Sequence, residues 1–216
     1  MKTLVLTCCA AFAAFAAFAD FAGNDRYRAA NEKTPEGKIV LFGDSITDFW
    51  PGRRSAFFKA HPELVGRGIS GQTTAEMICR FRSDVINIKP ARVVILAGTN
   101  DMAENRGPIK PEDALSNVKS MCELAKLHGI RPYLCSVLPS SRFGWRPKIT
   151  DAADRIRNFN AMLKKYAEEE KIDWIDYHSR MADEQGGMGD KADDGVHPNQ
   201  KGYAVMEEIL VKALGL

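Results

Sequence analysis

Short apolar runs alternate with helical periodicity from residue 38 to residue 214. Five runs bounded by glycine, proline or polar residues predict strands buried on both faces, at 38–42, 64–69, 92–96, 131–138 and 172–177. Apolar positions recur at helical spacing over 74–88, 111–128 and 158–167, and a last helix is expected over 199–214. Strands alternating with helices predict an α/β fold, a three-layer αβα sandwich around a parallel sheet with right-handed crossovers.

The first nineteen residues have a different pattern. Met1-Lys2 precedes an apolar run that ends in Ala17-Phe18-Ala19, which is typical of a secretory signal peptide with an A-x-A cleavage site. The run is shorter than the roughly 20 residues that a spanning helix needs. We therefore expect a signal peptide at 1–19, a polar leader at 20–36 and one domain at 37–216. The protein is expected to be exported, periplasmic or secreted, without stable membrane insertion; Cys8 and Cys9 leave a lipid anchor as a less favoured alternative.

Composition fits that organisation. The 216 residues are 45% hydrophobic and 27% charged, as in one globular domain. The net charge of +2 gives no broad basic surface for nucleic acid, and a small-molecule partner is expected. Removal of the signal peptide leaves Cys79, Cys122 and Cys135, an odd number that predicts no disulfide framework; all three are expected to be small buried hydrophobic residues. The oligomeric state cannot be read from the sequence.

Four polar or glycine-containing segments follow the predicted strands. They are Gly43-Asp44-Ser45-Ile46, Gly71 at the end of 68–71, Gly98-Thr99-Asn100-Asp101 and Asp194-Gly195-Val196-His197-Pro198. Parallel sheets place their ligand sites at the carboxyl ends of strands. We therefore expect these four segments to meet at one edge of the sheet.

The residue types in these segments are those that ester hydrolysis needs. Ser45 supplies a hydroxyl nucleophile, His197 a base for its proton, and Asp194 a carboxylate to orient the imidazole. The Asn100 side chain, the Gly71 N–H with no Cβ to obstruct it, and the Ser45 N–H are candidate donors to an oxyanion. Asp44 and Asp101 are expected to bind loop backbone instead. A zinc site is not expected, because the remaining histidines lack ligand spacing.

These motifs, in this order, closely resemble the SGNH or GDSL-like hydrolases, a family named for the serine, glycine, asparagine and histidine found here as Ser45, Gly71, Asn100 and His197. The resemblance extends from about residue 38 to 214, and the first motif reads GDSI instead of GDSL. It implies a flavodoxin-like fold with five parallel strands and acyl-ester hydrolysis through an acyl-serine, without metal or organic cofactor. The choice of Asp194 over Asp193 rests on the family's D-x-x-H spacing.

Two other functional classes are weaker. Residues 66–71 satisfy G-x-G-x-x-G, the pattern of a dinucleotide-binding oxidoreductase, but the position about 20 residues after Gly71 is Ala91, before the next strand begins. An inactive binding module would not need every part of an esterase site. The esterase is therefore favoured over both.

Aromatic residues in the bordering loops are candidates for substrate binding. Trp50, Phe143 and Trp145 could stack on a sugar ring or line an acyl groove, or equally pack beneath a loop. Export and the absence of a long apolar insertion favour short acyl esters, especially acetyl groups on carbohydrates. Lysophospholipid or lipase-type hydrolysis is the alternative within the same family.

Overall fold

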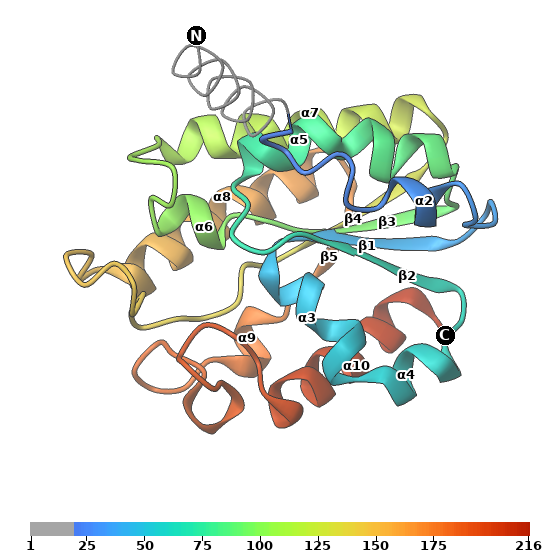
Figure 1. Ribbon diagram of the computed structural model, residues 1–216. Helices are drawn as coiled ribbons and strands as arrows, with labels where there is room; N and C mark the ends of the chain where they lie inside the picture. Colours follow the sequence, from blue (N-terminus) through green and yellow to red (C-terminus); the bar gives the residue numbers. More distant parts are fainter. Residues whose placement is uncertain (1–19) are drawn as a thin grey trace, which may run out of the picture.

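A computed structural model describes residues 20–216; the predicted signal peptide lies outside the described residues. Its centre is a parallel sheet with the strand order β2-β1-β3-β4-β5 (Figure 1). The strands are β1 (Ile39–Gly43), β2 (Leu64–Gly68), β3 (Arg92–Leu96), β4 (Arg131–Cys135) and β5 (Asp173–Ile175). This is the flavodoxin-like order, so the predicted fold class is confirmed.

The strand register brings the candidate segments to one edge of the sheet. Gly43 at the end of β1 lies opposite Gly68 of β2 on one side and Leu96 of β3 on the other. The residues that follow these three positions therefore leave the sheet at the same level.

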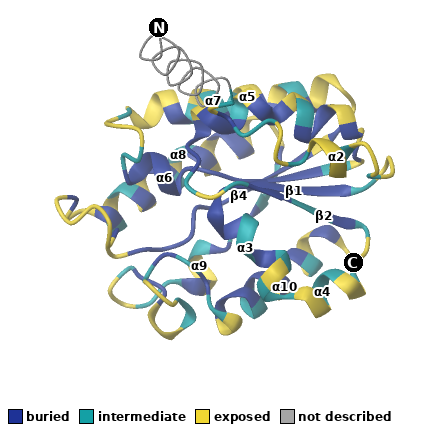
Figure 2. Ribbon diagram, viewed as in Figure 1, coloured by how far each residue is buried: buried dark blue, intermediate teal, exposed yellow. Residues whose placement is uncertain are grey.

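Helices cover both faces (Figures 1 and 2). On one face lie α5 (Thr74–Asp84), α7 (Pro111–Leu127) and α8 (Ala152–Glu169), and on the other α3 (Ser45–Arg53), α4 (Ser55–Ala60) and α10 (Gln200–Leu214). Short helices are α2 (Arg28–Asn31), α6 (Thr99–Met102) and α9 (His178–Met181), with 3-10 turns η1 (Ile86–Ile88) and η2 (Gly189–Lys191). The strand β1 serves both layers, because Val40 and Phe42 point into one core and Ile39 and Leu41 into the other.

Several predicted boundaries differ from the structure, among them the end of the helix expected over 74–88, which is reached at Asp84, and the end of the strand expected over 172–177, which is reached at Ile175. The helix expected from residue 158 begins at Ala152, since the buried stripe of Phe159 and Leu163 extends back through Ile156. The strand expected to reach residue 138 ends at Cys135, because the Asn160 side chain then binds both the N–H and the carbonyl of Val137.

Residues 20–36 lie along the edge strand β2 and helix α5 (Figure 1). Their polar groups bind the domain: the Tyr27 hydroxyl donates to the Gly68 carbonyl, and the Asn31 amide donates to Asp84. The segment that the sequence marks as a polar leader is thus closely bound to the domain.

The cysteine prediction is correct for Cys122 and Cys135, which are buried, and wrong for Cys79, which is exposed. Cys79 lies on the outer side of α5, whose buried positions include Met77, Arg80 and Phe81. Among the described residues, no helix is long and apolar enough to cross a membrane.

Candidate active site

Ser45 is the first residue of α3, directly after β1. The Asp44 side chain caps this helix by accepting the Ile46 N–H at 3.0 Å. The Ser45 Oγ lies 2.8 Å from His197 Nε2, although 152 positions separate the two residues in the chain. A nucleophile and a base are therefore within hydrogen-bond reach.

His197 lies in the loop before α10, with its other ring nitrogen bound to Asp194. Nδ1 is 2.7 Å from Asp194 Oδ2, and Asp194 Oδ1 accepts the backbone N–H groups of Val196 and His197. A proton on Nδ1, facing the carboxylate, leaves Nε2 free to accept the serine proton. Asp193 contacts Arg53 instead, at 2.7 Å.

The Asp194 carboxylate is held in its charged form. Burial acts to raise its pKa, but the hydrogen bonds from the His197 side chain, the His197 N–H and the Val196 N–H outweigh burial, and the pKa lies below its ordinary value. An ionised Asp194 fixes the imidazole tautomer and would stabilise an imidazolium.

Two residues that line the site have backbone N–H groups without a partner in the described part of the chain. Among the described residues, neither Ser45 N nor Gly71 N makes a hydrogen bond, and both residues line the same pocket. Gly71 has φ +78°, and a Cβ built on it would meet nothing within 4 Å. The left-handed backbone at this position favours glycine.

The third candidate donor, Asn100, has all of its polar atoms engaged. Its Nδ2 donates to the Gln72 carbonyl at 2.9 Å and to Asp44 Oδ2 at 3.2 Å. Its Oδ1 accepts from Asn105 Nδ2 at 2.6 Å, and Asn105 Oδ1 in turn accepts from Trp145 Nε1 at 2.7 Å. The sequence analysis missed Asn105: only its place in a loop after the third strand pointed toward the site.

The two buried aspartates bind backbone as expected. Asp101 accepts from the Thr74 N–H at 2.9 Å and from the Thr74 hydroxyl at 2.7 Å, which ties the start of α5 to the loop after β3. Burial raises the pKa of Asp44 to about 6, partly opposed by the hydrogen bond from Ile46 and by His197. Neither carboxylate contacts the Ser45 hydroxyl.

Ser45 opens into a pocket of about 210 Å³. Its lining consists of Ser45, Phe49, Ser70, Gly71, Asn100, Asn105, Trp145, Val196 and His197. Phe49 lies against the imidazole of His197, with ring centroids 5.2 Å apart, and Trp145 is 43% exposed. The pocket therefore has two aromatic walls and a polar floor.

The other aromatic candidates lie elsewhere. Trp50 is 2% exposed, donates to Glu207 at 3.2 Å and packs against Tyr203, because it lies one helical turn after the buried Ile46 on the inner side of α3. Phe143 is 1% exposed and packs beneath Trp145. The structure thus corrects the substrate-binding interpretation of Trp50 and Phe143 and leaves Trp145 at the pocket.

Comparison with known proteins agrees with this arrangement. The family model described as "GDSL-like Lipase/Acylhydrolase family" matches residues 41–205. The chain belongs to this family. A solved structure of a GDSL-like lipase from Bacteroides thetaiotaomicron is 41% identical, with a TM-score of 0.87 over 90% of this chain and 98% of that one. The chain is therefore a member of the GDSL-like acylhydrolases, enzymes that act on ester bonds.

Two curated relatives match over shorter segments. An uncharacterized lipoprotein of Bacillus subtilis is 30% identical over 117 residues, 47% of this chain and 48% of the relative. An acetylxylan esterase of Xylanibacter ruminicola is 28% identical over 150 residues, 61% of this chain and 30% of the relative. The matched segments thus span about half of the first relative and less than a third of the second.

Family membership removes the reason for the dinucleotide-binding alternative, and close packing explains the middle glycine of its motif, Gly68. A Cβ on Gly68 would lie 2.1 Å from the Asp48 nitrogen and 2.5 Å from the Thr47 carbonyl carbon. Glycine at this position lets β2 pack closely against α3.

Proposed function

We propose that the protein is a serine esterase that cleaves short acyl esters, above all acetyl esters of carbohydrates, through an acyl-Ser45 intermediate. The observation that carries the proposal is the 2.8 Å contact between Ser45 Oγ and His197 Nε2, with Asp194 behind the ring, at the wall of a small open pocket.

The proposed reaction has two halves. Ser45 Oγ attacks the ester carbonyl carbon while its proton moves to His197 Nε2, and the tetrahedral intermediate then collapses, the alcohol leaving with that proton. Water then attacks the acyl-serine, giving one proton to the imidazole, and collapse of the second intermediate releases the acid and restores the Ser45 hydroxyl. Asp194 stays ionised throughout and stabilises the imidazolium.

The oxyanion would be bound by three donors. The N–H groups of Ser45 and Gly71 have no partner in the described part of the chain and line the pocket. Asn100 Nδ2 has a longer contact, 3.2 Å to Asp44, which an oxyanion in the pocket would replace, while its 2.9 Å bond to the Gln72 carbonyl keeps the amide in place.

Pocket size and lining favour a short acyl group on a cyclic alcohol. A pocket of about 210 Å³, with Phe49, Trp145 and Val196 as its apolar lining, offers little surface to a fatty chain. The half-exposed Trp145 ring is suited to stack on a sugar. The similarity to an acetylxylan esterase supports the same substrate class over a lysophospholipid.

We also propose that the protein is exported after cleavage between Ala19 and Asp20. The A-x-A sequence at 17–19 supports this cleavage site, and the similarity to a lipoprotein supports export. The N-terminal sequence of protein recovered from the periplasm or medium tests the site; retention of Met1 would contradict it.

The experiment for the esterase is a substrate panel on purified residues 20–216. We expect the highest kcat/KM for acetylated xylosides and aryl acetates, with a steep loss from aryl butyrate to aryl octanoate and no turnover of lysophosphatidylcholine. Ser45→Ala is expected to abolish turnover and labelling by a fluorophosphonate. A preference for octanoate would favour the lipase-type alternative, and a folded wild-type protein that neither turns over an ester nor labels at Ser45 would favour the inactive binding module.

A further inference from the structure

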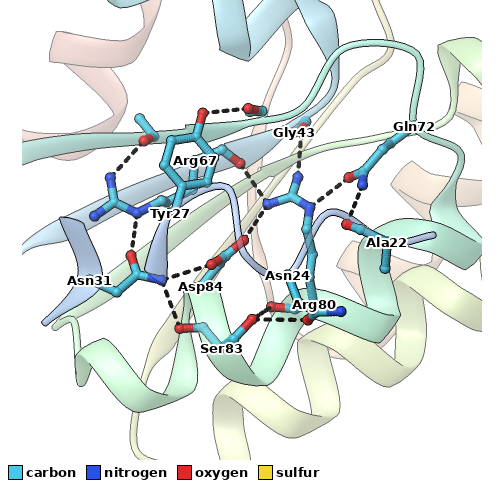
Figure 3. A network of polar contacts seen from close by, with 12 residues as sticks. Ala22, Asn24, Tyr27, Asn31, Gly43, Arg67, Gln72, Arg80, Ser83 and Asp84 are labelled. Atoms are coloured by element: carbon cyan, nitrogen blue, oxygen red, sulfur yellow. Dashed lines mark hydrogen bonds and ion pairs between the residues drawn. The ribbon is translucent and has the colours of Figure 1, made fainter. Parts of the chain in front are cut away.

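Arg80 is a fully buried arginine between the sheet and the N-terminal segment. Its side chain is 0% exposed, as is that of Asp84, with which it forms an ion pair at 2.9 Å within α5 (Figure 3). Burial lowers the pKa of Arg80, and the Asp84 carboxylate opposes this shift. A buried guanidinium is costly unless its N–H groups have acceptors, and each of its three nitrogens has at least one here.

Two of those acceptors lie next to residues of the candidate site. Arg80 Nη2 donates to the carbonyl of Gly43, two positions before Ser45, at 2.8 Å. Arg80 Nε donates to the side chain of Gln72, the residue after Gly71, at 2.6 Å. One rigid guanidinium thus links the end of β1, the strand that precedes Ser45, to the residues around Gly71. Residues 68–72 are called the oxyanion loop here.

Gln72 connects this link to a second oxyanion donor. Its backbone carbonyl accepts from Asn100 Nδ2 at 2.9 Å, while its side-chain Nε2 donates to the carbonyl of Ala22 at 2.6 Å. Gln72 is therefore bound to Asn100 and, as Figure 3 shows, at the same time to Arg80 and to Ala22 of the N-terminal segment.

The N-terminal strap, defined here as residues 22–34, binds the oxyanion loop at further points. The Tyr27 hydroxyl donates to the Gly68 carbonyl, and Asn31 accepts from Arg67 Nε at 2.6 Å (Figure 3). Arg26 pairs with Asp48 at 2.6 Å, and Asp48 accepts from the Ser70 hydroxyl at 2.7 Å. The strap therefore contacts the loop directly at Gly68 and Gln72, and it reaches Ser70 through Asp48 of α3.

The oxyanion loop has few hydrogen bonds between its own residues. Within it, Gln72 N contacts the Ile69 carbonyl at a long 3.4 Å. Outside it, the Gly43 carbonyl of β1 accepts from Ile69 N at 3.1 Å, and Asp48 of α3 accepts from Ser70 N at 3.2 Å. Gly71 lies between these points in a left-handed conformation that glycine adopts at little cost and leaves as easily. Side-chain contacts from Arg80, from the strap and from Asp48, which the strap residue Arg26 pairs with, therefore hold the Gly71 N–H in one direction.

We propose that Arg80 and the N-terminal strap are positioning elements of the oxyanion hole: they fix residues 68–72 so that the Gly71 N–H and the Asn100 amide stay aligned on the carbonyl attacked by Ser45. This inference rests on the proposed esterase function. It gives residues 22–34 a role in the rate of the chemical step, beyond that of a cover over the sheet edge. Arg80 acts through Gln72 and Gly43 and touches no substrate.

The test uses variants that remove single contacts and spare the Arg80–Asp84 pair. Tyr27→Phe removes only the hydroxyl that binds Gly68, and Gln72→Ala removes both side-chain links of Gln72. We expect kcat for an aryl acetate to fall about 10-fold in Gln72→Ala and less in Tyr27→Phe, with KM within about two-fold, because alignment of the oxyanion donors acts on the transition state. Gln72→Glu, which keeps an acceptor for Arg80, should recover much of the lost kcat.

The matched control is Arg28→Ala. Arg28 lies on the same strap but, among residues 20–216, pairs only with Asp25, and both side chains are exposed. Its kcat and KM should equal those of the wild type. If Tyr27→Phe and Gln72→Ala lower the thermal midpoint but leave kcat unchanged, the strap contributes to stability only, and the inference is overturned.

Amide hydrogen exchange supplies a readout that does not require turnover. Exchange of the 68–73 segment should quicken in Tyr27→Phe and Gln72→Ala but not in Arg28→Ala, and equal exchange in all three would overturn the link between strap and loop. If the wild type turns over esters and the variants have the same kcat, the positioning role is contradicted while the proposed esterase function stands. A wild-type protein inactive on every ester sinks the proposed function and, with it, the positioning role.

Discussion

At the scale of single residues, Asp44 combines a structural role with an energetic cost. It caps α3 next to Ser45, yet it is fully buried, and burial raises its pKa from 3.8 to about 6. An ionised Asp44 in the folded protein thus costs about 3 kcal/mol relative to the unfolded chain.

This cost predicts a pH-dependent difference in stability between the wild type and Asp44→Asn. Below pH 3.8 Asp44 is protonated in both the folded and the unfolded state. Between pH 3.8 and about 6 the folded state binds the proton more tightly than the unfolded state does, so the free energy of unfolding of the wild type falls as the pH rises through this range. The free energy of unfolding of Asp44→Asn, relative to wild type, should therefore rise by up to about 3 kcal/mol between pH 4 and pH 8. Urea titrations across this range measure it; a constant difference would contradict an elevated pKa.

Asn100→Ala tests the oxyanion hole directly. Loss of one donor is expected to lower kcat by about 10² to 10³ with a smaller change in KM, because the bond strengthens only in the transition state. Steady-state kinetics measure it, with the thermal midpoint as the control for folding. An unchanged kcat would remove Asn100 from the proposed mechanism.

At the scale of elements, the loop carrying Trp145 is coupled to the helix carrying Asn100 through Asn105. We expect Trp145→Ala to raise KM for an acetylated xyloside about five-fold, since a lost aromatic stack is worth about 1 kcal/mol, and to leave KM for ethyl acetate, which has no ring, unchanged. Trp145→Phe should retain most of the xyloside affinity. Equal changes for both substrates would argue against a sugar platform.

The contact between α3 and α10 supplies a second element-scale prediction. Trp50→Ala is expected to lower the free energy of unfolding by about 3–5 kcal/mol, because it leaves a cavity against Tyr203, while Glu207 stays paired with Arg54. Denaturant unfolding measures this loss, and active-site titration gives kcat per folded molecule, which should match the wild type. A raised KM at normal stability would return Trp50 to the substrate site.

At the scale of the whole molecule, the sequence was most informative where the pattern is regular. Buried strands such as Ile39–Gly43 are apolar runs between glycines, and the motifs after them follow the strand order, so the fold class was predictable. Helical period alone did not show that Trp50 faces inward or that Cys79 faces solvent, because the direction of a helical face depends on tertiary packing. The contact that places Asn105 at the site could not be predicted for a similar reason, because its partner Trp145 lies 40 positions away in the chain.

The number of reactive thiols among the five cysteines tests both the burial of the core and the cleavage of the signal peptide. Burial raises the pKa of Cys122 to about 12 and that of Cys135 well above its ordinary value, so both thiols are protected from ionisation and from reagent in the folded chain, whereas Cys79 is exposed. A disulfide reagent at pH 8 should therefore titrate one thiol in the folded mature protein. Unfolding in guanidinium should reveal three thiols after cleavage at Ala19 and five in a chain that retains Cys8 and Cys9. Two fast thiols before unfolding would contradict the burial of Cys122 or Cys135, and five thiols in protein recovered outside the cytoplasm would contradict the cleavage.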